Sequence, residues 1–220
     1  MIGKTPDFNY IFDEMRALKK ANGLKMYDNS RRAVRWYFQN MKDLYKEMPV
    51  STDKMIRGTR NRLVKVVRQG EMVLFGYRAQ TQLGTGRFNY YDRYPLILVL
   101  GFNDRHILGV NLHMLYPGMR QAFFELVLPL VSGANTKDAD NRARLLGMSY
   151  ALLTRHKYRY GKACVRRYLR GRLTTPMLLV PSDMWATALH LPTMSIVPPG
   201  VNQIRVWEDT KRKIRDQGGI

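Results

Sequence analysis

The spacing of apolar and polar positions is helical in the first part of the chain. Residues 10–18 place apolar side chains one helical turn apart behind Asp7, which is a good N-cap residue. A second run of the same kind ends at Pro49, and Ser51 is placed to cap a short third helix. Residues 1–60 are therefore predicted to form an N-terminal helical segment.

The pattern changes to that of short strands over residues 61–116, which we predict to be a β-rich core. The stretch "RLVKVVRQGEMVLFGYRAQ" is rich in Val, Leu, Phe and Tyr and is interrupted by glycines, so it predicts two strands. "LILVLGF", "NDR" and "HILGVNLHML" then predict a strand, a tight turn at 103–105 and a second strand. Since no βαβ spacing occurs, we expect a small curved antiparallel sheet or an SH3-like barrel.

Helical spacing returns in residues 117–220, a C-terminal helical part that we expect to pack on the core. It contains a largely apolar helix at 138–158, a basic helix "GKACVRRYLRGR" at 161–172 and a polar helix from about 203 to 216. Its one clear strand is "TPMLLVP" at 175–181. With no internal repeat and no clear linker, the chain is predicted to be one compact α+β unit in which N- and C-terminal helices flank a central β-rich segment.

The charge of the chain narrows the choice of partner. The 220 residues include 45% hydrophobic positions, enough for a real core, yet Lys and Arg number 37 against 17 Asp and Glu. The formal net charge of +20 and a sequence pI near 10.3 favour a polyanionic partner, with nucleic acid first, an acidic protein surface second and an anionic membrane third. Because no apolar run is long enough to span a bilayer and the start is not a signal peptide, we expect a soluble, non-secreted protein without a membrane partner.

The basic residues are concentrated in two segments that contain no Asp or Glu, between Asp53 and Glu71 and between Asp140 and Asp183. Without compensating acids each cluster repels itself unless an anion neutralises it, and Arg, which predominates in both, grips phosphate with two hydrogen bonds. The predicted helix at 161–172 would place some of these cations on one face, at intervals of four residues. The predicted nucleic-acid-binding residues are Arg60, Arg62, Lys65, Arg68, Arg159, Lys162, Arg166, Arg167, Arg170 and Arg172.

Catalytic patterns are weak in this sequence. The four histidines lack the spacing of a zinc site, and the single Cys164 is more typical of a small core residue than of a nucleophile. Glu71, Asp92 and Asp104 would have to converge to hold the divalent ions of a nuclease, but their spacing matches no motif. Asp92 is better explained as a turn residue or as an ion pair with Arg93. We therefore expect no enzyme activity, no metal, no cofactor and no small-molecule substrate.

Several motifs resemble a known family. "GEMVLFGYRAQ", "FNYYDRYPLILVLGF" and "HILGVNLHML" are followed in order by "KYRYGKACVRRYLRGRL", "MLLVPSDMWATALHLPT" and "VWEDTKRKI". This order, from Gln69 to Ile214, resembles that of the DNA end protector proteins of large contractile-tailed bacteriophages. The resemblance implies a virion protein, made in the host cytoplasm, that acts in head completion and shields the end of packaged DNA from exonuclease.

By that resemblance, protection would come from steric occlusion and charge neutralisation, with double-stranded DNA, bound without sequence preference, and other virion proteins as partners. The alternative is a structural adaptor of the phage neck, tail or baseplate whose basic faces dock on acidic neighbouring subunits. Such an adaptor would bury aromatic and Arg anchors in large interfaces and bind little free DNA. On either hypothesis the Tyr-rich segment from Phe88 to Leu115 is read as the structural centre, and the binding charge lies elsewhere.

Overall fold

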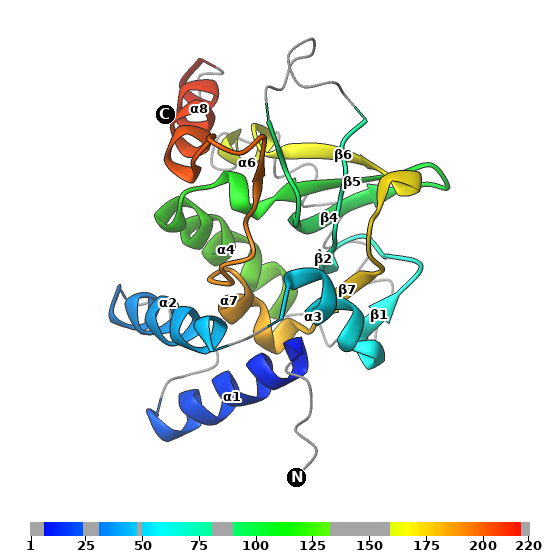
Figure 1. The fold of residues 1–220 in the computed structure, drawn as a ribbon. Coiled ribbons are helices and arrows are strands. Elements are labelled where there is room, and N and C mark those ends of the chain that lie inside the picture. The colour runs from blue at the N-terminus through cyan, green and yellow to red at the C-terminus, as the bar shows by residue number, and fades with distance from the viewer. Residues whose placement is uncertain (1–6, 24–30, 48–49, 81–89, 133–158, 217–220) are drawn as a thin grey trace.

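The computed structural model describes residues 7–23, 31–47, 50–80, 90–132 and 159–216, so the helix predicted at 138–158 lies outside the described residues (Figure 1). The fold is α+β, as predicted. A six-stranded antiparallel sheet has the strand order β1-β7-β2-β4-β5-β6. Its strands are β1 (Leu63–Val64), β2 (Met72–Leu74), β4 (Leu96–Phe102), β5 (His106–Asn111), β6 (Val165–Leu169) and β7 (Met177–Val180).

The two ends of the strand order, β1 and β6, do not pair with each other, so the six described strands form an open sheet. The predicted curved antiparallel sheet is confirmed, and the SH3-like barrel offered with it is not formed. A second small sheet pairs β3 (Tyr91–Asp92) with β8 (Ile196–Val197). Strands β6 and β7 come from the C-terminal part of the chain, so the sheet joins segments far apart in sequence.

The hairpin of β4 and β5 forms as predicted. The Asn103 side chain closes its turn, because its Oδ1 accepts hydrogen bonds from the backbone N–H groups of Arg105 and His106, both at 2.9 Å. A register shift between Val99 and Gly101 marks a bulge, and a bulge bends the strand and increases its twist. The hairpin is thus the curved middle of the sheet.

Gly109 in β5 provides a test of how tightly this hairpin packs. A Cβ at this position would lie 2.8 Å from Ile97 Cδ1 and 2.9 Å from the Leu98 carbonyl oxygen, closer than atoms can pack. We expect Gly109→Ala to lower the free energy of unfolding by about 1–3 kcal/mol, measured by urea denaturation. Gly101→Ala in β4 is the matched control, since nothing lies within 4 Å of its Cβ position. Equal stability of the two variants would contradict this packing.

Both faces of the sheet are buried, which explains why its strands read as nearly continuous apolar runs. Alternate residues of β4 face opposite ways: Leu96, Leu98 and Leu100 belong to the large core under the helices, whereas Ile97 and Val99 belong to a smaller core on the other face. The smaller core is rich in aromatic rings. The sheet therefore has helices on one side and an aromatic cluster on the other.

The helices begin where the sequence places caps. Asp7 Oδ1 accepts from the Tyr10 N–H at 3.0 Å, and Ser51 Oγ accepts from the Lys54 N–H at 3.4 Å, so both predicted caps are confirmed. In Figure 1, α1, α2, α4 and α7 lie together on one side of the strands. The helices are α1 (Phe8–Ala21), α2 (Arg31–Lys46), α3 (Thr52–Gly58), α4 (Pro117–Ser132), α6 (Arg159–Lys162), α7 (Trp185–Ala188) and α8 (Gln203–Asp216), with short 3-10 turns η1 (Arg60–Arg62), η2 (Leu112–Met114), η4 (Arg170–Arg172) and η5 (Ser182–Met184).

The predicted basic helix at 161–172 is wrong. Of this span, Gly161 and Lys162 end the short helix α6 and Arg170–Arg172 form the 3-10 turn η4. Between them, Val165–Leu169 form β6, which pairs with β5 along its whole length. The open edge of β5 supplies backbone partners that an isolated helix of this length lacks, and Val165 and Tyr168 fit a pleated surface. The stripe of cations expected on one helical face is therefore not formed, because Lys162 ends α6, Arg166 lies in β6 and Arg170 lies in η4.

Candidate nucleic-acid interface

The structure brings the two acid-free segments into contact. Arg170, in η4, donates from Nη2 to the Lys65 carbonyl oxygen at 2.6 Å, although 105 residues separate the two. The Arg170 backbone N–H also donates to the Arg105 carbonyl oxygen at 2.9 Å, and the Arg78 N–H donates to the Arg172 carbonyl oxygen at 3.0 Å. We call this surface the basic rim and define it as Lys65, Arg78, Arg105, Arg167, Arg170 and Arg172.

The basic rim is exposed and poorly compensated. Five of its six side chains are exposed, and Arg170 is partly buried. None of the ion pairs found within the described ranges includes a rim residue. The exposed carboxylate of Asp104 lies in the same hairpin turn as Arg105. Because like charges this close together repel, an anion bound on the rim would relieve the repulsion.

Sequence reasoning missed Arg78 and Arg105, because both lie outside the two acid-free segments. Arg105 directly follows an acid, and Arg78 stands alone after β2. The sequence offers one signal for these two residues, which is their position. Each lies beside the end of a predicted strand, and the turns that connect strands gather at the ends of a sheet. Only the pairing of strands shows which turns meet.

The predicted residues of the first segment have different roles. Arg62 donates from Nε to Asn9 Oδ1 at 2.7 Å, which ties η1 to α1. Arg60 is exposed beside it, and Arg68 is exposed with its backbone N–H bound to Glu71 Oε2 at 2.8 Å. Lys65 is thus the predicted member of this segment that the rim includes.

The predicted residues of the second segment also separate. Arg167, Arg170 and Arg172 belong to the rim, whereas Arg166 is half-buried and donates from Nη1 to the carbonyl oxygens of Ala163 at 2.7 Å and Val165 at 2.8 Å. Lys162 is exposed at the end of α6, and Arg159 begins that helix. Arg166 therefore holds the turn before β6 in place.

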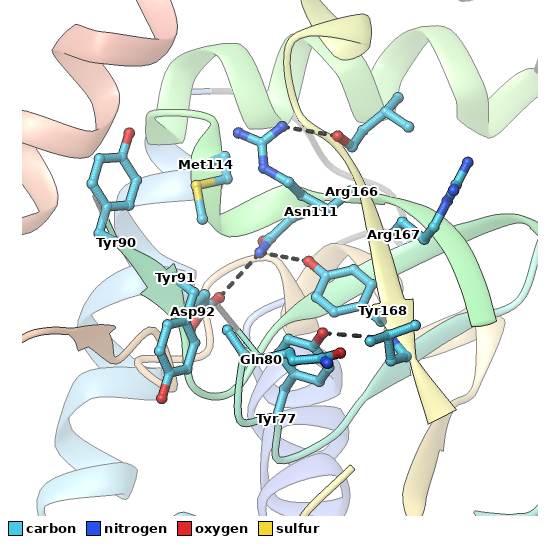
Figure 2. A pocket seen from close by; sticks show the side chains of 13 residues that line it. Tyr77, Gln80, Tyr90, Tyr91, Asp92, Asn111, Met114, Arg166, Arg167 and Tyr168 are labelled. Atoms are coloured by element: carbon cyan, nitrogen blue, oxygen red, sulfur yellow. Dashed lines mark hydrogen bonds between the residues drawn. The ribbon is translucent and has the colours of Figure 1, made fainter. Parts of the chain in front are cut away.

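A pocket of about 390 Å³ opens beside β6 (Figure 2). In Figure 2, Tyr90 and Tyr91 stand on one side of it and Tyr77 and Tyr168 on the other. The Tyr77 and Tyr168 rings meet edge to face with their centroids 5.0 Å apart, which fixes that wall. The pocket is lined by Tyr77, Ala79, Gln80, Tyr90, Tyr91, Asp92, Asn111, Met114, Val165, Arg166, Arg167, Tyr168 and Leu169.

A buried hydrogen-bond network supports the pocket floor. Asp92 Oδ2 pairs with His113 Nδ1 at 2.7 Å, and both side chains are fully buried. Asn111 Nδ2 donates to the same oxygen at 3.4 Å and to the Tyr168 hydroxyl at 3.1 Å. Since the network links the strands that carry the tyrosines, it fixes the pocket shape.

The other oxygen of Asp92 shows which of its predicted roles is correct. Asp92 Oδ1 accepts from the Tyr94 N–H two residues on, at 3.1 Å, and from the Ser195 N–H at 3.2 Å. This local bond makes Asp92 a turn residue, as predicted. The alternative, an ion pair with Arg93, is not formed, because the Arg93 guanidinium lies 5.5 Å from the centre of the Tyr94 ring instead.

Burial raises the pKa of phenol and thiol side chains in this region. It raises the pKa of the Tyr168 phenol, and it raises the pKa of Tyr90, near Asp209, to about 12. It also raises the pKa of the buried Cys164 thiol to about 12, which agrees with the predicted core role of Cys164. At neutral pH the Tyr90 and Tyr168 phenols are therefore uncharged.

Among the described residues, no group of three or more His, Cys, Asp and Glu side chains is placed to hold a metal ion. Glu71, Asp92 and Asp104 all lie in that part of the chain, so they do not converge into a metal site. Across the same ranges, no helix has the length and apolar character needed to cross a membrane.

Comparison with protein-family models gives a match over most of the chain. The family model described as the phage T4 terminal DNA protecting protein matches residues 12–210, which include the whole sheet and most of the N-terminal helical segment. No curated protein and no solved structure matches the chain. The match includes the basic rim and the pocket.

Proposed function

The chain belongs to the phage T4 terminal DNA protecting protein family, and we propose that it binds the end of packaged double-stranded DNA and shields it from exonuclease. The observation that carries this proposal is the basic rim, where two acid-free segments of the chain meet through Arg170 and Lys65. An exposed cationic surface that backbone contacts hold in place suits a rigid, highly charged polymer.

Phosphate binding explains why the rim keeps so much uncompensated charge. Each cation that neutralises a phosphate releases condensed counterions, so binding is strong at low salt and falls steeply as salt rises. Contacts of this kind position a protein on DNA without reading its sequence. The proposed partner is therefore duplex DNA of any sequence.

In the proposed mechanism the protein makes and breaks no bonds. A protein seated on the last base pairs occupies the surface that an exonuclease must reach, and the bound cations keep it there. The proposal also includes a location in the virion, where the protein contacts other virion proteins. It would act there during head completion.

An exonuclease challenge tests the protection directly. Linear duplex incubated with the protein should be digested at least tenfold more slowly than free duplex at low salt, and the protection should disappear as salt rises, because phosphate contacts are lost. The measurement is the fraction of full-length DNA over time. The control is a duplex whose two ends are closed by hairpin loops, so that digestion starts at an internal nick instead of at an end. Digestion at the free-DNA rate under all salt conditions would contradict the proposal.

A second candidate function is supported by apolar side chains next to the rim. Val66 is 62% exposed beside Lys65, and Phe102 is 45% exposed at the end of β4. Exposed apolar anchors surrounded by Arg are common where proteins bind proteins. A structural adaptor in the neck, tail or baseplate would use them to dock on acidic subunits. It would give salt-sensitive binding to virion proteins and no protection of DNA ends.

A further inference from the structure

Building on the proposed DNA-end binding, we propose that the pocket between β3 and β6 takes up an unpaired nucleotide at the end of a DNA strand. The family match gives no site, and the rim alone would bind duplex ends and duplex interiors alike. The pocket adds a feature that distinguishes an end, because the base that enters it must be unpaired.

The walls of the pocket suit a planar base. Its volume of about 390 Å³ falls in the range of roughly 300–1,000 Å³ that is typical of ligand sites. Four tyrosines line it, and Tyr91 is the one whose ring is only partly buried. Every base has a flat apolar face, so stacking on tyrosine accepts any sequence. Tyr91 is therefore the expected stacking partner.

The strand edge on one wall can hydrogen-bond the edge of a base. The Cys164 carbonyl oxygen accepts from the Asn111 N–H of β5, and the Arg170 N–H donates to the Arg105 carbonyl oxygen in the turn before β5. The Leu169 N–H points the other way, away from β5, and donates to the Tyr77 hydroxyl at 3.4 Å. Because these directions alternate along a strand, the N–H and C=O of Arg167 also turn away from β5, toward the pocket. One donor and one acceptor side by side match the mixed donor and acceptor pattern of a base edge.

The charge beside the pocket suits the phosphate of the same nucleotide. Arg166 and Arg167 line the pocket, and Arg172 lies near enough to Tyr77 to affect its pKa. Arg167 and Arg172 are also members of the basic rim. A strand lying along the rim would therefore carry its phosphates past the mouth of the pocket and present its last base to the tyrosines.

A base inside a duplex cannot reach this site without leaving its partner and its stack. That cost is smallest for a base that is already unpaired, such as one in an overhang or a frayed end. The pocket therefore favours strand ends over interiors, which the rim phosphate contacts cannot do.

The test uses duplexes that differ only at the end. One is blunt and the other carries a short overhang whose last base is 2-aminopurine, a fluorescent base that reports stacking. We expect the protein to bind the overhang about tenfold more tightly than the blunt end and to change the aminopurine fluorescence. Tyr91→Ala should remove both effects and leave blunt-end binding unchanged. Ala79→Trp, which fills the pocket and leaves every tyrosine in place, should do the same.

Tyr10→Ala is the matched control, because Tyr10 is 45% exposed on α1, away from the pocket lining. Equal affinity for both duplexes, or an overhang preference that survives both pocket variants, would overturn the inference. Free deoxyadenosine monophosphate that binds as tightly as the overhang would overturn the assignment to a strand end. If the protein bound neither duplex, the proposed function would fail, but the pocket could still be tested with 2-aminopurine at the end of a single-stranded oligonucleotide. Unchanged fluorescence of that oligonucleotide on adding the protein would overturn the inference about the pocket.

Discussion

Replacing Lys65, Arg167 and Arg172 by alanine is expected to weaken binding to blunt duplex DNA about 100-fold at about 150 mM salt. All three side chains are exposed on the basic rim and lie in none of the ion pairs within the described ranges. Removing three phosphate contacts should also reduce the slope of log K against log salt by about three. The measurement is a salt series of equilibrium binding curves.

The matched control removes the same charge elsewhere. Arg32, Arg35 and Lys42 are exposed on α2, and their replacement by alanine lowers the net charge by the same three units. We expect this control to keep most of the affinity and the slope of the wild type. Equal losses in the two triple variants would mean that net charge alone drives binding, and the rim would not be the site.

Asp92→Ala is expected to lower the free energy of unfolding by about 3–5 kcal/mol. The substitution leaves His113, whose side chain is fully buried, without its partner at 2.7 Å. It also removes the acceptor of the Tyr94 and Ser195 N–H groups and of the Asn111 amide. Buried donors without acceptors are costly. Urea denaturation of the wild type and the variant measures the loss.

Two further variants show whether the loss of stability comes from the buried network or from removing any carboxylate. Asp92→Asn keeps one carbonyl oxygen for the backbone N–H groups, so it should be less harmful than Asp92→Ala. Asp13→Ala removes an exposed carboxylate paired with Arg16 and should cost less than about 1 kcal/mol. If Asp92→Ala were as mild as Asp13→Ala, the network would not hold the pocket floor.

Local chemistry made several elements predictable. A cap depends only on the residues within one turn, so Asp7 and Ser51 start helices in the structure as the sequence indicates. The turn at Asn103 is local for the same reason, since the side chain bonds its own turn. The C-terminal helix also runs from Gln203 to Asp216, as its spacing predicted.

The basic strand β6 shows where local reasoning failed. Its residues have a spacing that also fits a helix, and a short segment does not decide between the two by itself. The open edge of β5 decides the outcome, and that edge exists only once the hairpin has folded. The helical interpretation placed Arg166 and Arg170 on one binding face, whereas the structure turns Arg166 onto nearby carbonyl oxygens and places Arg170 on the rim.

The sequence by itself determined the sign and the rough location of the charge, since the absence of acids in two segments is visible without coordinates. It also determined the caps, the hairpin and the α+β class, because these depend on neighbours along the chain. Only the tertiary structure decided that Lys65 and Arg170 meet and that four tyrosines surround a pocket next to them. Such contacts join segments more than 100 residues apart and form only when the strands pair. The free energy of that pairing comes from packing between distant segments, which cannot be read from neighbouring residues in the sequence.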